Sequence, residues 1–255
     1  MRAFLQAVVA VTLASCSAHA QERPRCEAGK GYGAADISYQ VDDAFLKGIK
    51  SIGISTVIRY YDWPDETLPG KTLTRHELRL IRKHKLHLAV VFQHHNDSMQ
   101  TFETAGRGTT DAKRTLALAK TFKQPRRTAI YFGVDGVDAK FLAEFKKGNR
   151  PESDKFGISL IKRYFEEIKA VFKARKAPYA VGVYGSGLVC REILHARLAK
   201  YCWLANAKSW PEYAAFEATK RWSLKQLLPT PDCFGAETDL NIVGARSRNF
   251  GQWKP

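Results

Sequence analysis

The chain has 255 residues, which is enough for one large domain or two small ones. Its 41 Lys and Arg residues against 25 Asp and Glu residues give a formal net charge of +16 at pH 7. A balance this basic is typical of proteins with an anionic partner. No nucleic-acid-binding motif occurs, so we expect no nucleic acid among the partners.

The N-terminus has the pattern of a secretory signal peptide over residues 1–20. Arg2 precedes an apolar run over residues 3–14, and Ala18-His19-Ala20 forms an Ala-x-Ala cleavage site. The run is shorter than the roughly 20 residues of a transmembrane helix. We therefore expect an exported protein, secreted or periplasmic, without a transmembrane span. Leu13-Ala14-Ser15-Cys16 also resembles a bacterial lipobox, which would make Cys16 a lipid anchor to the membrane.

Four cysteines follow the predicted cleavage site, namely Cys26, Cys190, Cys202 and Cys233. An even number in an exported protein favours disulfides, and four cysteines permit three pairings. Cys26 and Cys233 each lie just outside a predicted terminal strand, so closing a barrel would bring them together. Cys190 and Cys202 would then join a helix to the following strand. No Cys-x-x-Cys motif or Cys/His cluster occurs, so we expect no metal and no cofactor.

Strand and helix patterns alternate after a polar leader over residues 21–30. Apolar runs predict eight strands, at residues 31–38, 55–61, 86–93, 129–134, 178–184, 201–205, 222–227 and 238–243. Helical spacing predicts helices at residues 41–52, 75–84, 111–122, 141–174 with an interruption at 148–151, 187–199 and 213–219. Residues 94–110 are predicted as a long polar loop. Five β/α units followed by three strands with short connections indicate the α/β class and a TIM-like barrel. We expect one barrel domain over residues 31–246, a C-terminal tail over residues 247–255, and a monomer.

The C-terminal strand ends of such a barrel meet in one pocket, so residues at those ends are candidates for chemistry. They are Asp36, Arg59, Tyr60, Gln93, Asp135, Asp138, Tyr184, Asn206, Gln226 and Asp239. An acidic and aromatic set suits sugar chemistry, in which carboxylates handle protons and aromatic faces stack on pyranose rings. Structural roles compete with this interpretation. Asp36 could cap the following helix, Arg59 could pair with a neighbouring acid, and Asp135-Gly136 is also an ordinary turn signal.

Seven segments resemble, in their order, a known family. They are Gly33-Ala34-Ala35-Asp36-Ile37-Ser38, Val57-Ile58-Arg59-Tyr60-Tyr61, Ala89-Val90-Val91-Phe92-Gln93, Ile130-Tyr131-Phe132-Gly133-Val134-Asp135, Val181-Gly182-Val183-Tyr184-Gly185-Ser186, Trp203-Leu204-Ala205 and Asp239-Leu240-Asn241. Together they resemble the glycoside-hydrolase-like domain of unknown function (1906 type), which is related to the family 25 lysozymes, or muramidases. The resemblance covers residues 31–246 and implies a barrel with five β/α units and three further strands.

The resemblance also implies where catalytic carboxylates would lie. The related lysozymes carry an Asp-x-Glu motif at the end of strand four, with the Glu as general acid. Here Asp135 matches the Asp, Val137 stands at the Glu position, and Asp138 follows one residue later. Asp36 and Asp239 match the first-strand and last-strand Asp of that family. Since Asp is one methylene shorter than Glu, Asp138 replaces the acid only if the intervening turn brings it inward.

Two main hypotheses follow, with a third behind them. In the first, the protein hydrolyses a glycosidic bond in peptidoglycan or a related envelope glycan, with Asp135 as main carboxylate and Asp138 or Asp36 as second. Asp239 and Tyr184 would orient the substrate; if Asp135 acts alone, the substrate's own acetamido group could supply the nucleophile. In the second, the same pocket binds the glycan, or another anionic wall polymer, without cutting it. In the third, the barrel is only the scaffold of a basic envelope protein.

Overall fold

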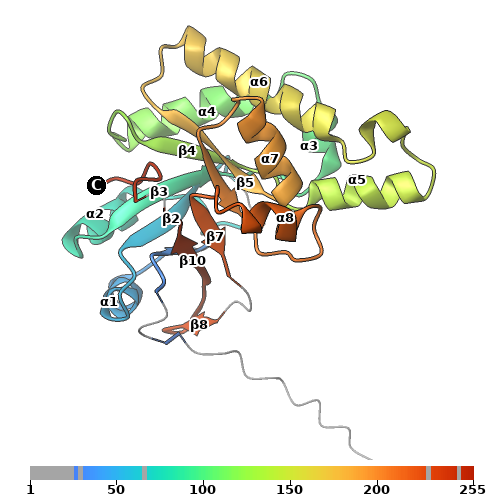
Figure 1. The fold of residues 1–255 in the computed structure, drawn as a ribbon. Helices are drawn as coiled ribbons and strands as arrows, with labels where there is room; N and C mark the ends of the chain where they lie inside the picture. The colour runs from blue at the N-terminus through green and yellow to red at the C-terminus, as the bar shows by residue number, and fades with distance from the viewer. Residues whose placement is uncertain (1–25, 28–30, 65–67, 228–230, 246–247) are drawn as a thin grey trace, which may run out of the picture.

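The computed structural model describes residues 26–27, 31–64, 68–227, 231–245 and 248–255. The predicted signal peptide, the lipobox cysteine and most of the polar leader lie outside these residues. Eight of the described strands close into one barrel, and helices cover its outside (Figure 1). The predicted α/β class and barrel architecture are confirmed.

One strand of the barrel runs against the direction of the others. The barrel strands are β1 (Ala34–Asp36), β2 (Thr56–Tyr61), β3 (His87–Phe92), β4 (Ala129–Gly133), β5 (Ala180–Gly185), β6 (Tyr201–Leu204), β7 (Leu224–Gln226) and β10 (Asp239–Val243). Strands β1 to β7 are parallel in chain order, whereas β10 lies between β7 and β1 and is antiparallel to both. The first residue of β10 therefore lies beside the last residue of β1, at the C-terminal mouth of the barrel.

The helices follow the strands, with one departure from prediction. They are α1 (Asp43–Ser51), α2 (Arg75–Lys83), α3 (Met99–Glu103), α4 (Arg107–Thr121), α5 (Val137–Lys146), the 3-10 helix η1 (Glu152–Asp154), α6 (Ile158–Ala174), α7 (Gly187–His195) and α8 (Tyr213–Ala218). The predicted loop over residues 94–110 is wrong in part, because it contains α3 and the start of α4. Tertiary packing explains why α4 begins at Arg107, four residues before the predicted start. A Cβ at Gly108 would lie 2.2 Å from the carbonyl oxygen of Tyr164, so α4 approaches α6 too closely for a larger residue.

Side chains along each barrel strand alternate between two apolar cores. On β2, Val57 and Tyr61 pack in the outer core between the barrel and its helices. Ile58 packs in the barrel interior, and Tyr60 packs against the same interior cluster. Trp203, from β6, is buried in that cluster as well. This alternation decides which strand-end residues point into the mouth.

Residues 248–255, predicted as a tail, close the N-terminal end of the barrel. Phe250 is buried in the interior cluster, and the hydroxyl of Tyr131 donates to its carbonyl oxygen at 2.8 Å. Trp253 forms a β-bridge with Leu88 near the start of β3. Gly251 has a φ of 92°, and a Cβ there would lie 2.1 Å from a side-chain atom of β4, so only glycine fits. This segment packs as part of the domain.

Both disulfides that the sequence favours are present. Cys26 and Cys233, with Cα atoms 5.0 Å apart, tie the N-terminal end of the described chain to β8 (Asp232–Cys233). Cys190 and Cys202, 5.7 Å apart at Cα, join α7 to β6. Strand β8 pairs with β9 (Ala236–Glu237) in a small hairpin that the sequence analysis did not predict. Among the described residues, no helix is long and apolar enough to cross a membrane.

Candidate active site

The mouth of the barrel gathers inward-facing polar and aromatic side chains from seven strands. Alternation gives these residues the same orientation as the interior cluster, and hydrogen bonds or mutual electrostatic effects connect them. They are Asp36, Tyr60, Gln93, Asp135, Tyr184, Gln226 and Asp239. Seven of the ten residues predicted from strand ends thus come together at the mouth.

Asp36 is the most deeply buried carboxyl group at the mouth, with 3% of its surface exposed. The amide of Asn241 donates to Asp36 Oδ2 at 2.6 Å, and the indole nitrogen of Trp203 donates to Asn241 Oδ1 at 2.7 Å. Burial, together with the negative charge of Asp239, raises the pKa of Asp36 well above its usual range, although the Asn241 bond opposes this. The site therefore favours a protonated Asp36.

Asp135 is half-buried, and its partner is an amide. Gln93 Nε2 donates to Asp135 Oδ2 at 2.9 Å. Burial raises the pKa of Asp135, and the bond from Gln93 opposes that shift. The following residue, Gly136, has a φ of 73°, and a Cβ there would lie 2.6 Å from the ring of Trp210. Glycine thus allows the sharp turn that places Asp135 at the mouth.

The third carboxylate is held by a chain of hydrogen bonds. Gln226 Nε2 donates to Asp239 Oδ2 at 2.9 Å, and the hydroxyl of Tyr184 donates to Gln226 Oε1 at 3.0 Å. Burial and the negative charges of the mouth aspartates raise the pKa of both Tyr184 and Tyr60 well above the usual range. Both tyrosines therefore keep neutral hydroxyl groups that can donate hydrogen bonds.

A small pocket of about 180 Å³ opens beside Asp36 and Asp239. Its lining residues are Asp36, Ser38, Tyr39, Tyr60, Glu237 and Asp239. The hydroxyl of Tyr39 donates to the carbonyl oxygen of Glu237 at 2.7 Å, which holds the β8–β9 hairpin against the loop after β1. Sequence reasoning missed Ser38 and Tyr39 because they follow the end of β1, and it missed Glu237 because strand β9 was not predicted. It also missed Asn241, although that residue lies two positions after Asp239 on the same face of β10.

Arg59 does not lie in the mouth, so its predicted role in substrate binding is wrong, whereas the alternative of pairing with a neighbouring acid is confirmed. It precedes the inward-facing Tyr60 by one residue, so its side chain points out of the barrel toward α2. There Arg59 Nε donates to Glu77 Oε1 at 2.7 Å, with both side chains buried. The guanidinium also donates to the carbonyl oxygens of Ile37 and Gly70. This arrangement is structural, joining the ends of β1 and β2 to the start of α2.

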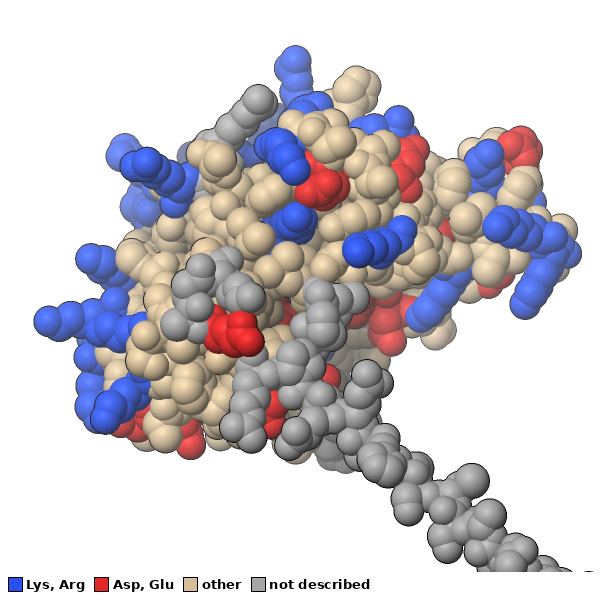
Figure 2. Space-filling model, turned by 60° about the horizontal axis from the view of Figure 1, so that its bottom comes forward, with Lys and Arg blue, Asp and Glu red and all other residues tan. Residues whose placement is uncertain are grey.

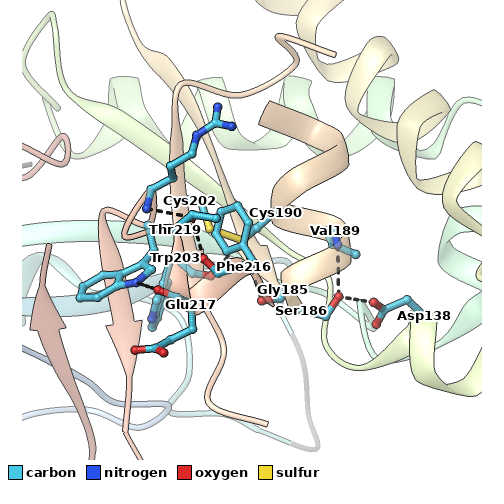
Figure 3. Close-up of a disulfide and its surroundings, with 12 residues drawn as sticks. Asp138, Gly185, Ser186, Val189, Cys190, Cys202, Trp203, Phe216, Glu217 and Thr219 are labelled. Atoms are coloured by element: carbon cyan, nitrogen blue, oxygen red, sulfur yellow. Dashed lines mark hydrogen bonds between the residues drawn. A yellow bond between two sulfur atoms is a disulfide. The ribbon is translucent and has the colours of Figure 1, made fainter. Parts of the chain in front are cut away.

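Asp138 lies outside the mouth and away from its three carboxyl groups, in the first turn of α5. Its side chain is fully buried and points toward Ser186, as Figure 3 shows. Ser186 Oγ donates to Asp138 Oδ2 and accepts from the backbone N–H of Val189 at 3.2 Å, which caps α7. Burial raises the pKa of Asp138 to about 6. Asp138 thus joins the turns that follow β4 and β5.

Asn206 follows β6 and is the last of the predicted residues. Only 8% of its surface is exposed. Its Oδ1 atom is buried and has no hydrogen-bond partner among the residues that the structure describes. A buried acceptor in this state is usually satisfied by an ordered water.

The family model described as Rv2525c-like, glycoside hydrolase-like domain matches residues 47–241. The chain belongs to this family. The match includes every predicted mouth residue except Asp36, and it confirms the resemblance to a glycoside-hydrolase-like domain. A comparison with curated proteins finds no match.

Solved structures share the barrel with this family member at low sequence identity. The Tat-secreted protein Rv2525c of Mycobacterium tuberculosis, in complex with L-tartrate, has 19% identity and a TM-score of 0.64, covering 88% of this chain and 99% of its own. The catalytic domain of endolysin ply40, from bacteriophage P40 of Listeria monocytogenes, has 13% identity and a TM-score of 0.50, covering 84% and 93%. The spore cortex lytic enzyme SleM of Clostridium perfringens has 11% identity and a TM-score of 0.51, covering 84% and 67%. At these identities, the likeness concerns the fold.

Proposed function

We propose that this protein hydrolyses a glycosidic bond in peptidoglycan or a related envelope glycan, with Asp135 as the main carboxylate. The observation that carries the proposal is the convergence of Asp36, Asp135 and Asp239 at one mouth, beside the rings of Tyr60 and Tyr184. Glycoside hydrolysis needs carboxyl groups in different protonation states and a surface on which a sugar ring can stack. The endolysin and spore cortex lytic enzyme that share the fold act, by their names, on bacterial envelopes.

The second carboxyl group in this proposal is Asp36, not Asp138. Burial and the charge of Asp239 favour a protonated Asp36, which suits a general acid that donates a proton to the leaving oxygen. Asp138 points toward Ser186 and serves the helix cap. Asp135, whose carboxylate accepts a bond from Gln93, would stabilise the positive charge that develops on the sugar ring.

Polar groups around the carboxylates would position the glycan. The hydroxyl group of Tyr60 stays neutral and can donate to a sugar oxygen, whereas that of Tyr184, which donates to Gln226, can accept from a sugar hydroxyl. Asp239 would act by holding Asp36 in its protonated form and by orienting substrate through the chain to Gln226 and Tyr184.

Export is part of the proposal. Two disulfides are typical of proteins outside the cytoplasm, and the related Rv2525c is described as Tat-secreted. Envelope glycan would then be within reach. A monomer, a signal peptide ending at Ala20 and an anchor at Cys16 remain predictions from the sequence.

One observation favours a second candidate function, glycan binding without cleavage. Val137 occupies the position that the Glu would take in an Asp-x-Glu motif, and it is fully buried in the first turn of α5. The mouth would then hold an envelope glycan through the same carboxylates and tyrosines. The two candidates differ only in turnover.

Incubation with purified peptidoglycan separates the candidates. Mass spectrometry of the soluble products should show released muropeptides with the unchanged protein and none with Asp135→Asn. The matched control is Asp154→Asn in η1, which is not among the mouth residues and should release the same products as the unchanged protein. Equal release by Asp135→Asn would contradict the proposed hydrolase. Retention on peptidoglycan without release by the unchanged protein would favour the binding function.

A further inference from the structure

The base of the barrel, opposite the mouth, contains a hollowed surface. Two hollows, of about 380 and 590 Å³, share a wall formed by Ala177, Pro178 and Tyr179, where α6 ends and β5 begins. The smaller one extends along α4, and the larger one extends to the segment between α7 and β6. We call the two together the basal groove.

Cationic side chains line the basal groove. They are Lys113, Lys120, Arg126, Lys169, Lys173, Arg175, Lys176, Arg197 and Lys200, and no Asp or Glu lines it. All nine residues are exposed. Within the described part of the chain, none of the nine forms an ion pair with a carboxylate. The groove therefore concentrates positive charge that the protein itself leaves uncompensated.

The backbone at the base adds an independent observation. Five helices are followed, one residue beyond their C-caps, by a basic residue with φ between 47° and 57°, where glycine is usual. They are Lys85, Lys123, Lys176, Arg197 and Lys220, of which Lys176 and Arg197 line the groove. A left-handed conformation is unfavourable for a residue with a Cβ. A cation at a helix C-terminus offsets only part of that cost, so stability alone gives little reason to replace glycine there.

Positive charge continues beyond the groove. A third hollow, of about 220 Å³, is lined by Arg75, Arg79, Arg82, Lys123 and Lys254, again without Asp or Glu. Figure 2 shows Lys and Arg side chains projecting along the left edge of the molecule, the side on which α2 and the C-terminus lie in Figure 1. The mouth, in contrast, carries the aspartates. The two ends of the barrel thus differ in the sign of their charge.

We propose that the basal groove binds a linear polymer with repeated phosphate groups. A concave groove fits a chain better than a flat membrane surface. Six of its nine cations are lysines, which contact phosphate oxygens as point charges from any direction, and its three arginines can bind phosphate oxygens through the guanidinium fork. Pro178 and Tyr179 form the floor that the two hollows share between these cations. This binding is independent of the proposed glycan chemistry, because the groove lies at the other end of the barrel.

The test uses long-chain inorganic polyphosphate as the probe, with binding measured by calorimetry at about 0.15 M salt. The triple variant K173E/K176E/R197E should bind at least about tenfold more weakly than the unchanged protein. The matched control is K47E/K146E/K147E, on α1 and at the C-terminal end of α5, and it changes the net charge equally. Its three lysines are exposed and form no ion pair among the described residues. It should stay within about threefold of the unchanged protein. Thermal unfolding of both variants checks that they fold.

Several outcomes would overturn the proposal. Equal weakening by both triple variants would show attraction by net charge alone, and unchanged binding by the groove variant would exclude the groove. Equally tight, groove-dependent binding of poly-glutamate would remove the preference for phosphate. Tighter groove-dependent binding of single-stranded DNA, or of anionic lipid vesicles that polyphosphate does not displace, would replace the proposed partner with a nucleic acid or a membrane. Release of muropeptides should be the same in all three proteins. A failure of the polyphosphate-binding proposal is therefore distinguishable from a failure of the proposed hydrolase.

Discussion

Asp36 and Asp239 are register partners across the antiparallel pair of β1 and β10. Directly opposed residues in such a pair point to the same face of the sheet, so both carboxyl groups face the mouth of the barrel. Two carboxyl groups that face each other across a strand pair do not both ionise readily. The charge of Asp239 adds to burial in raising the pKa of Asp36. Asp239 therefore helps to set the pH at which Asp36 loses its proton.

Asp239→Asn should lower the pKa of Asp36, because it removes a negative charge and keeps an oxygen that can accept from Gln226. If a protonated Asp36 is the general acid, activity falls as pH rises through that pKa. The alkaline limb of the pH profile of kcat/KM should therefore move to lower pH in the variant. Asp232→Asn, at the exposed first residue of β8, is the control and should leave the profile in place. An alkaline limb that stays unchanged in Asp239→Asn would argue against Asp36 as the acid.

Asp138 should make the protein less stable as pH rises from about 4 to about 6. Its pKa in the folded protein is about 6, against 3.8 for an ordinary Asp, so the folded state binds more protons across this interval. The free energy of unfolding therefore falls with rising pH, by about 2 to 3 kcal/mol in total for this group. Asp138→Asn should flatten this dependence, because Asn has no proton to lose and can still accept from Ser186.

Urea unfolding at several pH values measures the Asp138 effect directly. The difference in free energy of unfolding between Asp138→Asn and the unchanged protein should grow in favour of the variant from pH 4 to pH 6. Asp154→Asn is again the matched control, with no pH-dependent difference of this size. A constant difference across the interval would mean that Asp138 does not titrate there.

Alternation along a strand explains which site predictions from the sequence succeeded. Tyr60 and Arg59 are adjacent, and both stand at the end of an apolar run, yet only Tyr60 shares the inward face with Ile58. Applying the two-residue period of a strand strictly would have predicted opposite orientations for the two side chains. The same rule would have found Asn241 from Asp239. The carboxylate ring at the mouth was thus largely predictable, since it depends on strand ends and their period alone.

Other features depended on contacts between distant parts of the chain. Asp138 follows Asp135 closely in sequence, but α5 begins directly after the Gly136 turn and directs Asp138 toward Ser186 on the next unit. Helix α3 and the β8–β9 hairpin are too short to show a period. The closing of the barrel base by Phe250 requires a segment more than 100 residues after Tyr131. Local sequence patterns contain no signal for such packing.

Arg59→Met should lower the free energy of unfolding by about 3 to 5 kcal/mol, because it leaves the buried charge of Glu77 without its partner. The double variant Arg59→Met, Glu77→Gln should recover part of this loss, since no unpaired charge remains. Arg79→Met, on the exposed face of α2, should cost less than about 1 kcal/mol. Muropeptide release per folded molecule should be unchanged in Arg59→Met. A specific loss of turnover, without a loss of stability, would indicate that Arg59 contacts the substrate.

Phe250→Ala should lower the free energy of unfolding by about 3 to 5 kcal/mol, because its ring fills the barrel interior beneath Tyr131. Phe234 offers a matched control, since half of its surface is exposed on the hairpin, and Phe234→Ala should cost about 1 kcal/mol or less. Urea unfolding of the two variants gives both values. If Phe250→Ala cost no more than Phe234→Ala, the C-terminal residues would be a tail outside the cooperative unit. A large difference would mean that any shortened chain must keep residues 248–255 for the barrel, and the mouth at its other end, to fold.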